Sequence, residues 1–231
     1  MRQSADSARR MMEAKGNSRQ KELAMINSVI FQDQTFVPVG ASVGLTELDG
    51  EQLIRVVKPE ENTEPDVATY ARLVGSDFHD GTIELDVRAR LMHWADIDCR
   101  GFIGIVFRAS EADDRFEGFY VRPRNGRSCT EPQRRIHTMQ YFSYPGYTFA
   151  YFREREIGDY EAKANIDMDE WVHIKAEVAG ASAKFYVDDM ETPALVVDEM
   201  FGGANARGGV GLYVDNGTEG NFKNLSVICE D

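Results

Sequence analysis

The sequence predicts an all-β fold, either a sandwich or a barrel, preceded by a short helical extension. Three observations support this prediction. From residue 28 onward, apolar and polar residues alternate with a period of two, which is typical of strands with one buried face. The apolar runs are short and are separated by turn residues such as glycine, asparagine and aspartate. Helical segments do not alternate with these runs, which argues against a parallel α/β sheet.

The first 27 residues differ in character from the rest of the chain. Residues 5–25 are rich in alanine, arginine, methionine, glutamate, lysine and glutamine, which favour a helix, with one interruption at Gly16 and Asn17. A weak apolar stripe on this helix could dock on the β domain or on a partner chain; a frayed terminal arm is the alternative. We therefore divide the chain into a helical extension, 1–27, and a β domain, 28–231.

The first clear strands lie in the middle of the chain. Residues 83–89 place Ile, Leu, Val and Ala on one face and charged residues on the other, which indicates a strand half-buried in an antiparallel sheet. Residues 101–108 are almost continuously apolar, which favours a central strand. Residues 116–122 and 135–142 are predicted as two further strands.

The second half of the chain contains the clearest hairpin. Residues 171–187 alternate on both sides of a turn at Gly180, where glycine is free to take a positive φ. The last two predicted strands, 208–214 and 220–228, are separated by Asp215, Asn216 and Gly217. Asn-Gly is a strong signal for a tight turn.

The charge of the chain excludes two classes of partner. Lys and Arg number 26 and Asp and Glu 39, so the net charge is −13. Such a chain lacks the basic surface that nucleic acids and anionic lipids require. Residues 100–135 nevertheless carry eight arginines against five acids, whereas residues 156–199 carry twelve acids and three lysines. The arginines either form a cationic patch for an anionic ligand or pair with the acidic stretch across the fold.

The sequence contains no recognisable transition-metal site or targeting segment. The three cysteines, Cys99, Cys129 and Cys229, cannot all pair within the chain, and their spacing suits no zinc site. A structural calcium ion at Asp215–Asn216 or Asp188–Asp189 is the one metal we consider, and we expect no other cofactor. The first 27 residues lack the apolar core of a secretory signal, and no segment has the length of a transmembrane helix. These observations assign neither a compartment nor an oligomeric state.

Several strand and turn segments together resemble a known superfamily. They are residues 77–87, 101–108, 117–123, 170–175, 209–213 and 217–225. They resemble the concanavalin A-like lectin/glucanase superfamily, and within it bacterial domains of the 3-keto-disaccharide hydrolase type and their laminin G-like relatives. The resemblance covers residues 30–228. It implies a two-sheet antiparallel jelly-roll sandwich that binds or cleaves glycans in a groove on its concave sheet.

The resemblance also directs attention to carboxylates on strands. Glucanases of this superfamily use a Glu-x-Asp-x-x-Glu strand motif, in which one carboxylate attacks and another donates a proton. The nearest match here is Glu84 and Asp86, but Arg88 follows and the third carboxylate is missing. We therefore interpret Glu84 and Asp86 as part of a solvated strand face.

One cluster of residues on two predicted strands suits ligand binding. Alternation along 101–108 and 116–122 places Arg108, Tyr120 and Arg122 on the face opposite the core, together with Gly104 and Gly118. Arginine offers a rigid donor fork for carboxylates or sulfates, tyrosine offers a flat ring, and glycine leaves space above the sheet. The alternative is a ladder of arginines paired with acids on neighbouring strands.

Further candidates come from aromatic and polar residues around these strands. Loop aromatics beside a groove are typical sugar-stacking surfaces, and ordinary sheet-edge aromatics are the alternative. The candidates are His137, Gln140, Tyr141, Tyr144 and Tyr147 after the arginine-rich loop, and Trp94 in an earlier loop. Trp171, at the start of a strand, is interpreted as core or sheet surface. Glu117 falls on the core side beside Phe119, where it either bonds an arginine structurally or acts as a general acid with a raised pKa.

Three functions follow from this reading of the sequence. The first is binding of a glycan, neutral or anionic, on the concave sheet through Arg108, Tyr120, Arg122, Gln140, Tyr141, Tyr144 and Trp94. The second is a glycoside hydrolase or related sugar-cleaving enzyme in which Glu117 is the catalytic carboxylate to test. The third is a protein-interaction domain that uses a sandwich edge or the N-terminal helix. The sequence does not specify a sugar or a linkage.

Overall fold

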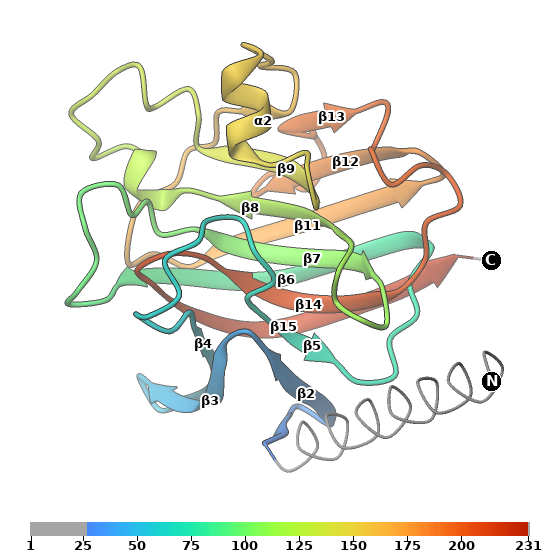
Figure 1. Cartoon of the computed structure of the whole chain (residues 1–231). Coiled ribbons are helices and arrows are strands. Elements are labelled where there is room, and N and C mark those ends of the chain that lie inside the picture. Colours follow the sequence, from blue (N-terminus) through green and yellow to red (C-terminus); the bar gives the residue numbers. More distant parts are fainter. Residues whose placement is uncertain (1–26, 231) are drawn as a thin grey trace, which may run out of the picture.

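The computed structural model describes residues 27–230 and shows two antiparallel β-sheets packed face to face (Figure 1). The predicted N-terminal helix lies outside the described residues, so the boundary at residue 27 stays a prediction. The all-β prediction is confirmed, and of the two architectures left open by alternation, the sandwich is the one observed.

One sheet has eight strands and carries the candidate site. Its central strands β7, β8 and β9 follow one another as an antiparallel meander. In spatial order the strands are β1 (Val29–Phe31), β2 (Gln34–Val39), β5 (Tyr70–Leu73), β14 (Gly209–Val214), β7 (Ile103–Ala109), β8 (Phe116–Val121), β9 (Met139–Tyr144) and β10 (Glu161–Ala162).

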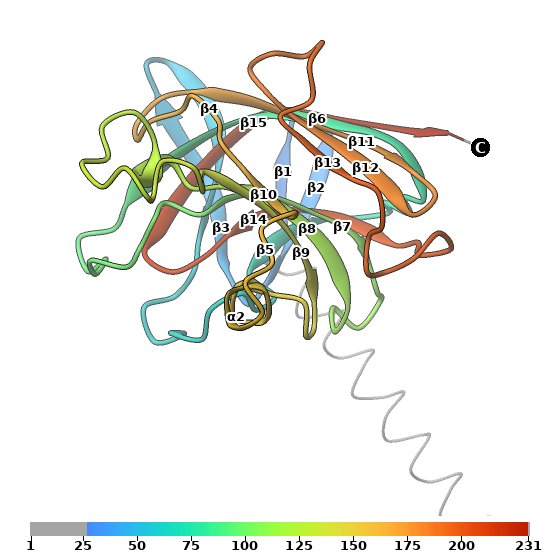
Figure 2. The same cartoon turned by 90° about the horizontal axis from the view of Figure 1, so that it is seen from above.

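The second sheet has seven strands and packs on one face of the first (Figure 2). Its longest pairing joins β6 to the C-terminal strand β15, with a bulge between Lys223 and Ser226. In spatial order the strands are β13 (Leu195–Val197), β12 (Ser182–Val187), β11 (Val172–Ala179), β6 (Asp80–Leu91), β15 (Thr218–Glu230), β4 (Glu51–Val57) and β3 (Ser42–Leu48).

Alternation in β6 shows how the sequence builds the core. Ile83, Leu85, Val87 and Ala89 are buried and belong to the apolar cluster between the sheets, while the residues between them face outward. Burial of such apolar side chains is the main stabilising contribution to a sandwich. The prediction for residues 83–89 is therefore confirmed.

The eight-stranded sheet is buried on both faces, which the seven-stranded sheet is not. All residues of β7 and β8 are buried. On the outer face, a second apolar cluster includes Val106, Tyr120, Phe142 and Tyr213, and helix α2 (Phe149–Glu154) adds the buried ring of Phe152. Figure 2 shows α2 on this side of the molecule. The outer face is therefore largely covered by side chains of the described residues.

The turns agree with the sequence except at one strand. The hairpin of β11 and β12 turns at Gly180, which has φ +57°, as predicted. The turn at Asp215–Gly217 joins β14 to β15 and so connects the two sheets. The strand predicted at 135–142 begins later, at Met139, because residues 135–138 belong to a loop.

Candidate functional site

A cavity of about 1030 Å³ lies at one end of the outer face of the eight-stranded sheet. Its walls come from the loops around residues 60–66, 94–102, 122–137 and 215–217, and from α2. Of the candidate residues named from the sequence, Trp94, Tyr120, Arg122 and His137 line this cavity. Gln140 lies directly behind them, bonded to both Tyr120 and Arg122.

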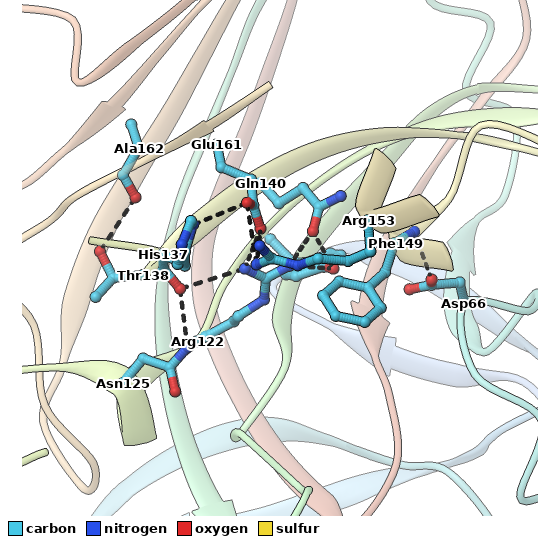
Figure 3. Close-up of polar contacts among 11 residues, drawn as sticks. Asp66, Arg122, Asn125, His137, Thr138, Gln140, Phe149, Arg153, Glu161 and Ala162 are labelled. Carbon is cyan, nitrogen blue, oxygen red and sulfur yellow. Dashed lines mark hydrogen bonds and ion pairs between the residues drawn. The ribbon is translucent and has the colours of Figure 1, made fainter. Parts of the chain in front are cut away.

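Arg122 is the centre of the polar network in the cavity wall (Figure 3). Its side chain is only 3% exposed. Its Nη1 donates to Glu161 Oε1 at 2.6 Å and to the carbonyl of His137 at 3.2 Å. Its Nη2 donates to Tyr120 Oη at 3.0 Å and to Gln140 Oε1. Arg122 is thus held rigidly and organises its neighbours, as the alternative of pairing with an acid anticipated.

Two guanidinium groups and an imidazole meet at the carboxylate of Glu161. Besides Arg122, the Nδ1 atom of His137 lies 2.8 Å from Glu161 Oε2, and Arg153 Nη2 lies 3.2 Å from the same oxygen. Glu161 is 4% exposed, whereas Arg153 is 43% exposed and lines the cavity. A charge-assisted network of this kind fixes the edge strand β10 against β9 and α2.

Phe149, the first residue of α2, forms an aromatic wall between two guanidinium groups. The Cζ atoms of Arg122 and Arg153 lie 5.5 and 5.0 Å from its ring centroid, which is the geometry of cation–π contacts. The N–H of Phe149 donates to Asp66 Oδ2 at 2.9 Å. This bond satisfies one of the free donors at the start of the helix, where the Thr148 side chain forms no cap.

Asp66 belongs to a buried polar chain that forms the opposite wall. Its N–H donates to Asp215 Oδ2 at 2.9 Å, and Lys58 Nζ lies 2.6 Å from Asp215 Oδ1. Burial, and secondly the charge of Asp215, raise the pKa of Asp66 to about 6. The Asp66 carboxyl can therefore hold or release a proton near neutral pH while it faces the cavity.

Aromatic and amide groups complete the cavity. Trp94 is half-buried in its loop, and the ring of Phe102 meets Tyr120 edge-on at 5.6 Å. Asn125, which is 5% exposed, donates from Nδ2 to the carbonyl of His137 at 2.9 Å. The site therefore combines flat apolar rings with fixed donors and acceptors.

The structure corrects the expectation that Arg108 shares an open face with Arg122. The pairing of β14 with β7 shifts register between Gly209 and Gly211, and Arg108 has φ +52°. This bulge interrupts the alternation on which the prediction depended. The Arg108 side chain is fully buried, lies 2.9 Å from Asp80 Oδ1 and donates to the carbonyls of His79, Gly180 and Gly203.

The predicted space above the glycines is also absent. A Cβ atom at Gly118 would lie 2.1 Å from the ring of Phe142, and one at Gly104 would lie 2.0 Å from the carbonyl oxygen of Phe119. These glycines admit a neighbouring ring and a neighbouring strand, so the expectation that they leave room for a ligand was wrong.

A second cavity, of about 690 Å³, holds other candidates at the opposite end of β8. It is lined by Arg108, Glu117, Tyr144 and Tyr147 among others. Tyr144 stacks on Phe116 with ring centroids 5.0 Å apart. Tyr141, expected beside the sugar, lies instead in the core between the sheets, because alternation along β9 directs Gln140 and Tyr141 to opposite faces.

Glu117 is buried on the core side, as predicted, and is held by two donors. Tyr141 Oη donates to its Oε2, and the N–H of Gly202 donates to its Oε1. Burial raises the pKa of Glu117, and these two hydrogen bonds oppose the shift. The residue thus connects β8 and β9 to the loop at residue 202, which favours the structural interpretation.

Glu84 and Asp86 lie on the outer face of the seven-stranded sheet, away from both cavities. Asp86 Oδ1 lies 2.7 Å from His173 Nδ1, in agreement with a solvated, paired strand face. Trp171, whose ring lies 4.4 Å from Lys223 Nζ, belongs to the same sheet surface.

The acidic turns considered for calcium are engaged within the chain. Asp215 is bonded to Lys58 and Asp66, Asp188 accepts the N–H of His173, and Asp189 accepts the N–H groups of Glu191 and Thr192. Within residues 27–230, no group of three or more His, Cys, Asp or Glu side chains could hold a metal ion. The three cysteines are free thiols.

Sequence reasoning did not identify Asp66, Phe149, Arg153 and Glu161 as site residues. They come from loops, a six-residue helix and a two-residue strand, where no periodic pattern exists. The excess of arginines at 100–135 and of acids at 156–199 was the one sequence feature that pointed to these residues. In the structure the two stretches form the ion pairs Arg122–Glu161 and Arg127–Glu170.

The two packed antiparallel sheets define a protein with the concanavalin A-like lectin/glucanase fold. The chain is similar to the carbohydrate-binding module CBM66 from Bacillus subtilis, with 15% identity, coverage of 81% of this chain and 94% of that chain, and a TM-score of 0.50. The narrower resemblance to 3-keto-disaccharide hydrolase and laminin G-like domains stays a prediction.

Two other solved structures show weaker similarity. A β-glucanase from Bacillus licheniformis has 12% identity and a TM-score of 0.41, and the match covers 86% of this chain and 80% of that chain. A protein with a galectin-like fold from Bacillus subtilis has 10% identity and a TM-score of 0.47, and the match covers 79% of this chain and 85% of that chain. No family model and no curated protein matches the chain. Among residues 27–230, no helix is long and apolar enough to cross a membrane.

Proposed function

We propose that this protein binds a carbohydrate in the large cavity at the end of the eight-stranded sheet. The observation that carries the proposal is the composition of this cavity: the rings of Trp94 and Phe149 stand beside the fixed polar groups of Asn125, Arg153 and Asp66. Sugars present apolar ring faces and a rim of hydroxyl groups, and ligand sites match such surfaces with aromatic rings and a few oriented polar groups.

The volume of the cavity supports the same function. At about 1030 Å³ it is at the upper end of the range for small-molecule sites, which is roughly 300–1,000 Å³. The middle of the outer face is covered by the second apolar cluster and α2. The ligand is therefore held in the cavity, whereas the sequence had suggested an open trough across the sheet. The similarity of the fold to that of a carbohydrate-binding module supports this proposal.

The two tryptophans of the chain allow a direct test. Trp94 lines the cavity and Trp171 lies on the other sheet. In a Trp171→Phe variant, Trp94 is the only indole, and we expect glycans selected on a glycan array to change its fluorescence saturably. Trp94→Ala removes the fluorescent reporter, so its binding is compared with that of the parent on the glycan array. We expect it to bind about tenfold or more weakly, since stacked aromatic contacts dominate such sites. Trp171→Ala is the matched control and should bind normally.

Two results would contradict the proposal. One is an array on which the folded protein retains no glycan. The other is glycan binding that Trp94→Ala leaves unchanged, which would place the sugar elsewhere on the molecule. Circular dichroism and thermal melting of each variant establish that the fold is intact.

A second candidate function, glycoside hydrolysis, is favoured by Asp66. A carboxyl with a pKa of about 6 can protonate a leaving group, and Asp215 supplies a second carboxylate in the same cavity. If the protein cleaves glycans, reducing ends should accumulate and Asp66→Asn should abolish their release while binding persists. Loss of activity in Glu117→Gln, with Asp66→Asn active, would instead assign the chemistry to the second cavity.

A further inference from the structure

At one corner of the large cavity, two guanidinium groups, of Arg122 and Arg153, and the imidazole of His137 surround a single carboxylate. All three groups share the carboxylate of Glu161. Arg122 is buried and lies closest, at 2.6 Å, so that Glu161 and Arg122 largely neutralise each other. Arg153 lies farther away, at 3.2 Å, and its side chain is 43% exposed. The positive charge of Arg153 is thus only partly compensated at the cavity surface.

Arg153 is also held in place before any ligand arrives. Its guanidinium packs 5.0 Å from the centroid of Phe149, four residues earlier on α2, and the start of that helix is fixed by the bond from Phe149 to Asp66. An arginine restrained in this way loses less conformational entropy when it binds an anion.

Gln140 adds an unused donor near the same corner. Its side chain is fully buried. Tyr120 Oη and Arg122 Nη2 both donate to Oε1, which fixes the orientation of the amide, and Nε2 then has no partner among residues 27–230. Figure 3 shows this nitrogen on the side of α2, from which Arg153 extends. The corner therefore has more donors than acceptors.

The acids of the cavity do not cancel this excess. Asp215 is bonded to Lys58 at 2.6 Å, and the Asp66 carboxylate is engaged by the N–H of Phe149 at 2.9 Å. At the mouth, Asp98 lies 3.3 Å from Arg100, and Asp96 accepts the N–H groups of residues 98 and 99. Glu60 is exposed at the rim.

We propose that the ligand is an acidic glycan and that Arg153 binds its carboxylate or sulfate group, turning part of its hydrogen bonding from Glu161 to the ligand. This inference rests on the proposed sugar site and specifies its ligand class. Arg122 keeps its ion pair with Glu161 when Arg153 turns. A planar guanidinium matches two oxygens of a carboxylate or sulfate. Arg153 is therefore the residue that would select acidic over neutral glycans.

The test compares ligands that differ only in charge. In the Trp171→Phe background, Trp94 fluorescence is titrated with a panel of uronic-acid oligosaccharides and with the same oligosaccharides after methyl esterification. Sulfated oligosaccharides and their desulfated forms make a second arm, which distinguishes the two anions. We expect an acidic form to bind about tenfold or more tightly than its neutral partner, with affinity falling as salt rises.

Arg153→Gln should remove this preference, and Arg153→Lys should restore part of it. Arg155→Gln is the matched control, because Arg155 lies two residues away and packs 4.1 Å from the ring of Tyr151, outside the cavity lining. Melting temperatures verify that each variant folds. Equal affinity for acidic and neutral forms, no binding by any acidic form, or equal effects of the two glutamine variants would overturn the inference. If neutral glycans still bind through Trp94, the proposed sugar site survives; if no glycan binds, both fail.

Discussion

At the scale of single residues, Asp66 has the most direct consequence for stability. Its pKa in the folded protein is raised from 3.8 to about 6, so between these pH values the folded state binds more protons than the unfolded state. The free energy of unfolding therefore falls as pH rises through this window.

Replacing Asp66 with asparagine tests this linkage. Asparagine can still accept the N–H of Phe149 but cannot ionise. We expect Asp66→Asn to be more stable than the parent near neutral pH by about 3 kcal/mol, with the difference vanishing below pH 4. Urea denaturation across this pH range measures it. Asp98→Asn, at a side chain 84% exposed, is the control and should leave the profile unchanged. If the free energy of unfolding of Asp66→Asn changed with pH in the same way as that of the parent, the Asp66 carboxyl would ionise normally and the prediction would be wrong.

The sequence correctly predicted the face of the sheet on which a side chain lies where successive residues of a regular strand point to opposite faces. Tyr120 and Arg122 lie on the outer face because β8 is regular, and Glu117 lies on the core side for the same reason. The prediction for Arg108 was wrong because a bulge near the end of β7 turns its side chain toward Asp80 in the other sheet. A bulge depends on the partner strand, about a hundred residues away in the sequence, and no local pattern announces it.

At the scale of elements, α2 is the feature that the sequence did not predict. It has six residues, which is too short to show helical periodicity, and isolated helices of that length are unstable. Its stability comes from tertiary contacts: Phe152 is 2% exposed within the second apolar cluster, and Phe149 is fixed by Asp66. The helix converts an exposed sheet face into a bounded cavity, which is why the predicted open groove is not observed.

The strands themselves were largely predictable. β6, β11 and β12 alternate clearly because one face of the seven-stranded sheet is solvated. β7 and β14 are buried on both faces; β7 was recognised as a nearly continuous apolar run, and β14 was predicted as the strand before the turn at Asp215–Gly217. Their assignment to two separate sheets came from the resemblance to the superfamily, since strand order depends on contacts between distant parts of the chain.

At the scale of the whole molecule, Arg108 connects the two sheets at the end opposite the large cavity. It extends from β7 of the eight-stranded sheet to Asp80 at the start of β6 and to the turn at Gly180, both in the seven-stranded sheet. Asp80 also accepts the N–H of Gly180 at 2.9 Å. A buried arginine with four partners is therefore a structural connector, in contrast to the ligand-binding role that the sequence suggested.

This interpretation predicts that removing Arg108 affects stability and spares ligand affinity. Arg108→Ala removes the Arg108 donors from three carbonyl groups and leaves Asp80 with the N–H of Gly180. Breaking a fully buried ion pair costs about 3–5 kcal/mol, and because Asp80 is 27% exposed we expect a loss toward the lower end of that range. Arg207→Ala is the control: its pair with Asp77 is 60% exposed on both sides and should contribute less than about 1 kcal/mol. Denaturant unfolding measures both variants. Glycan affinity read from Trp94 should stay the same in Arg108→Ala below its unfolding temperature, because Arg108 does not line the large cavity. Loss of affinity in a fully folded Arg108→Ala protein would return this residue to the binding site.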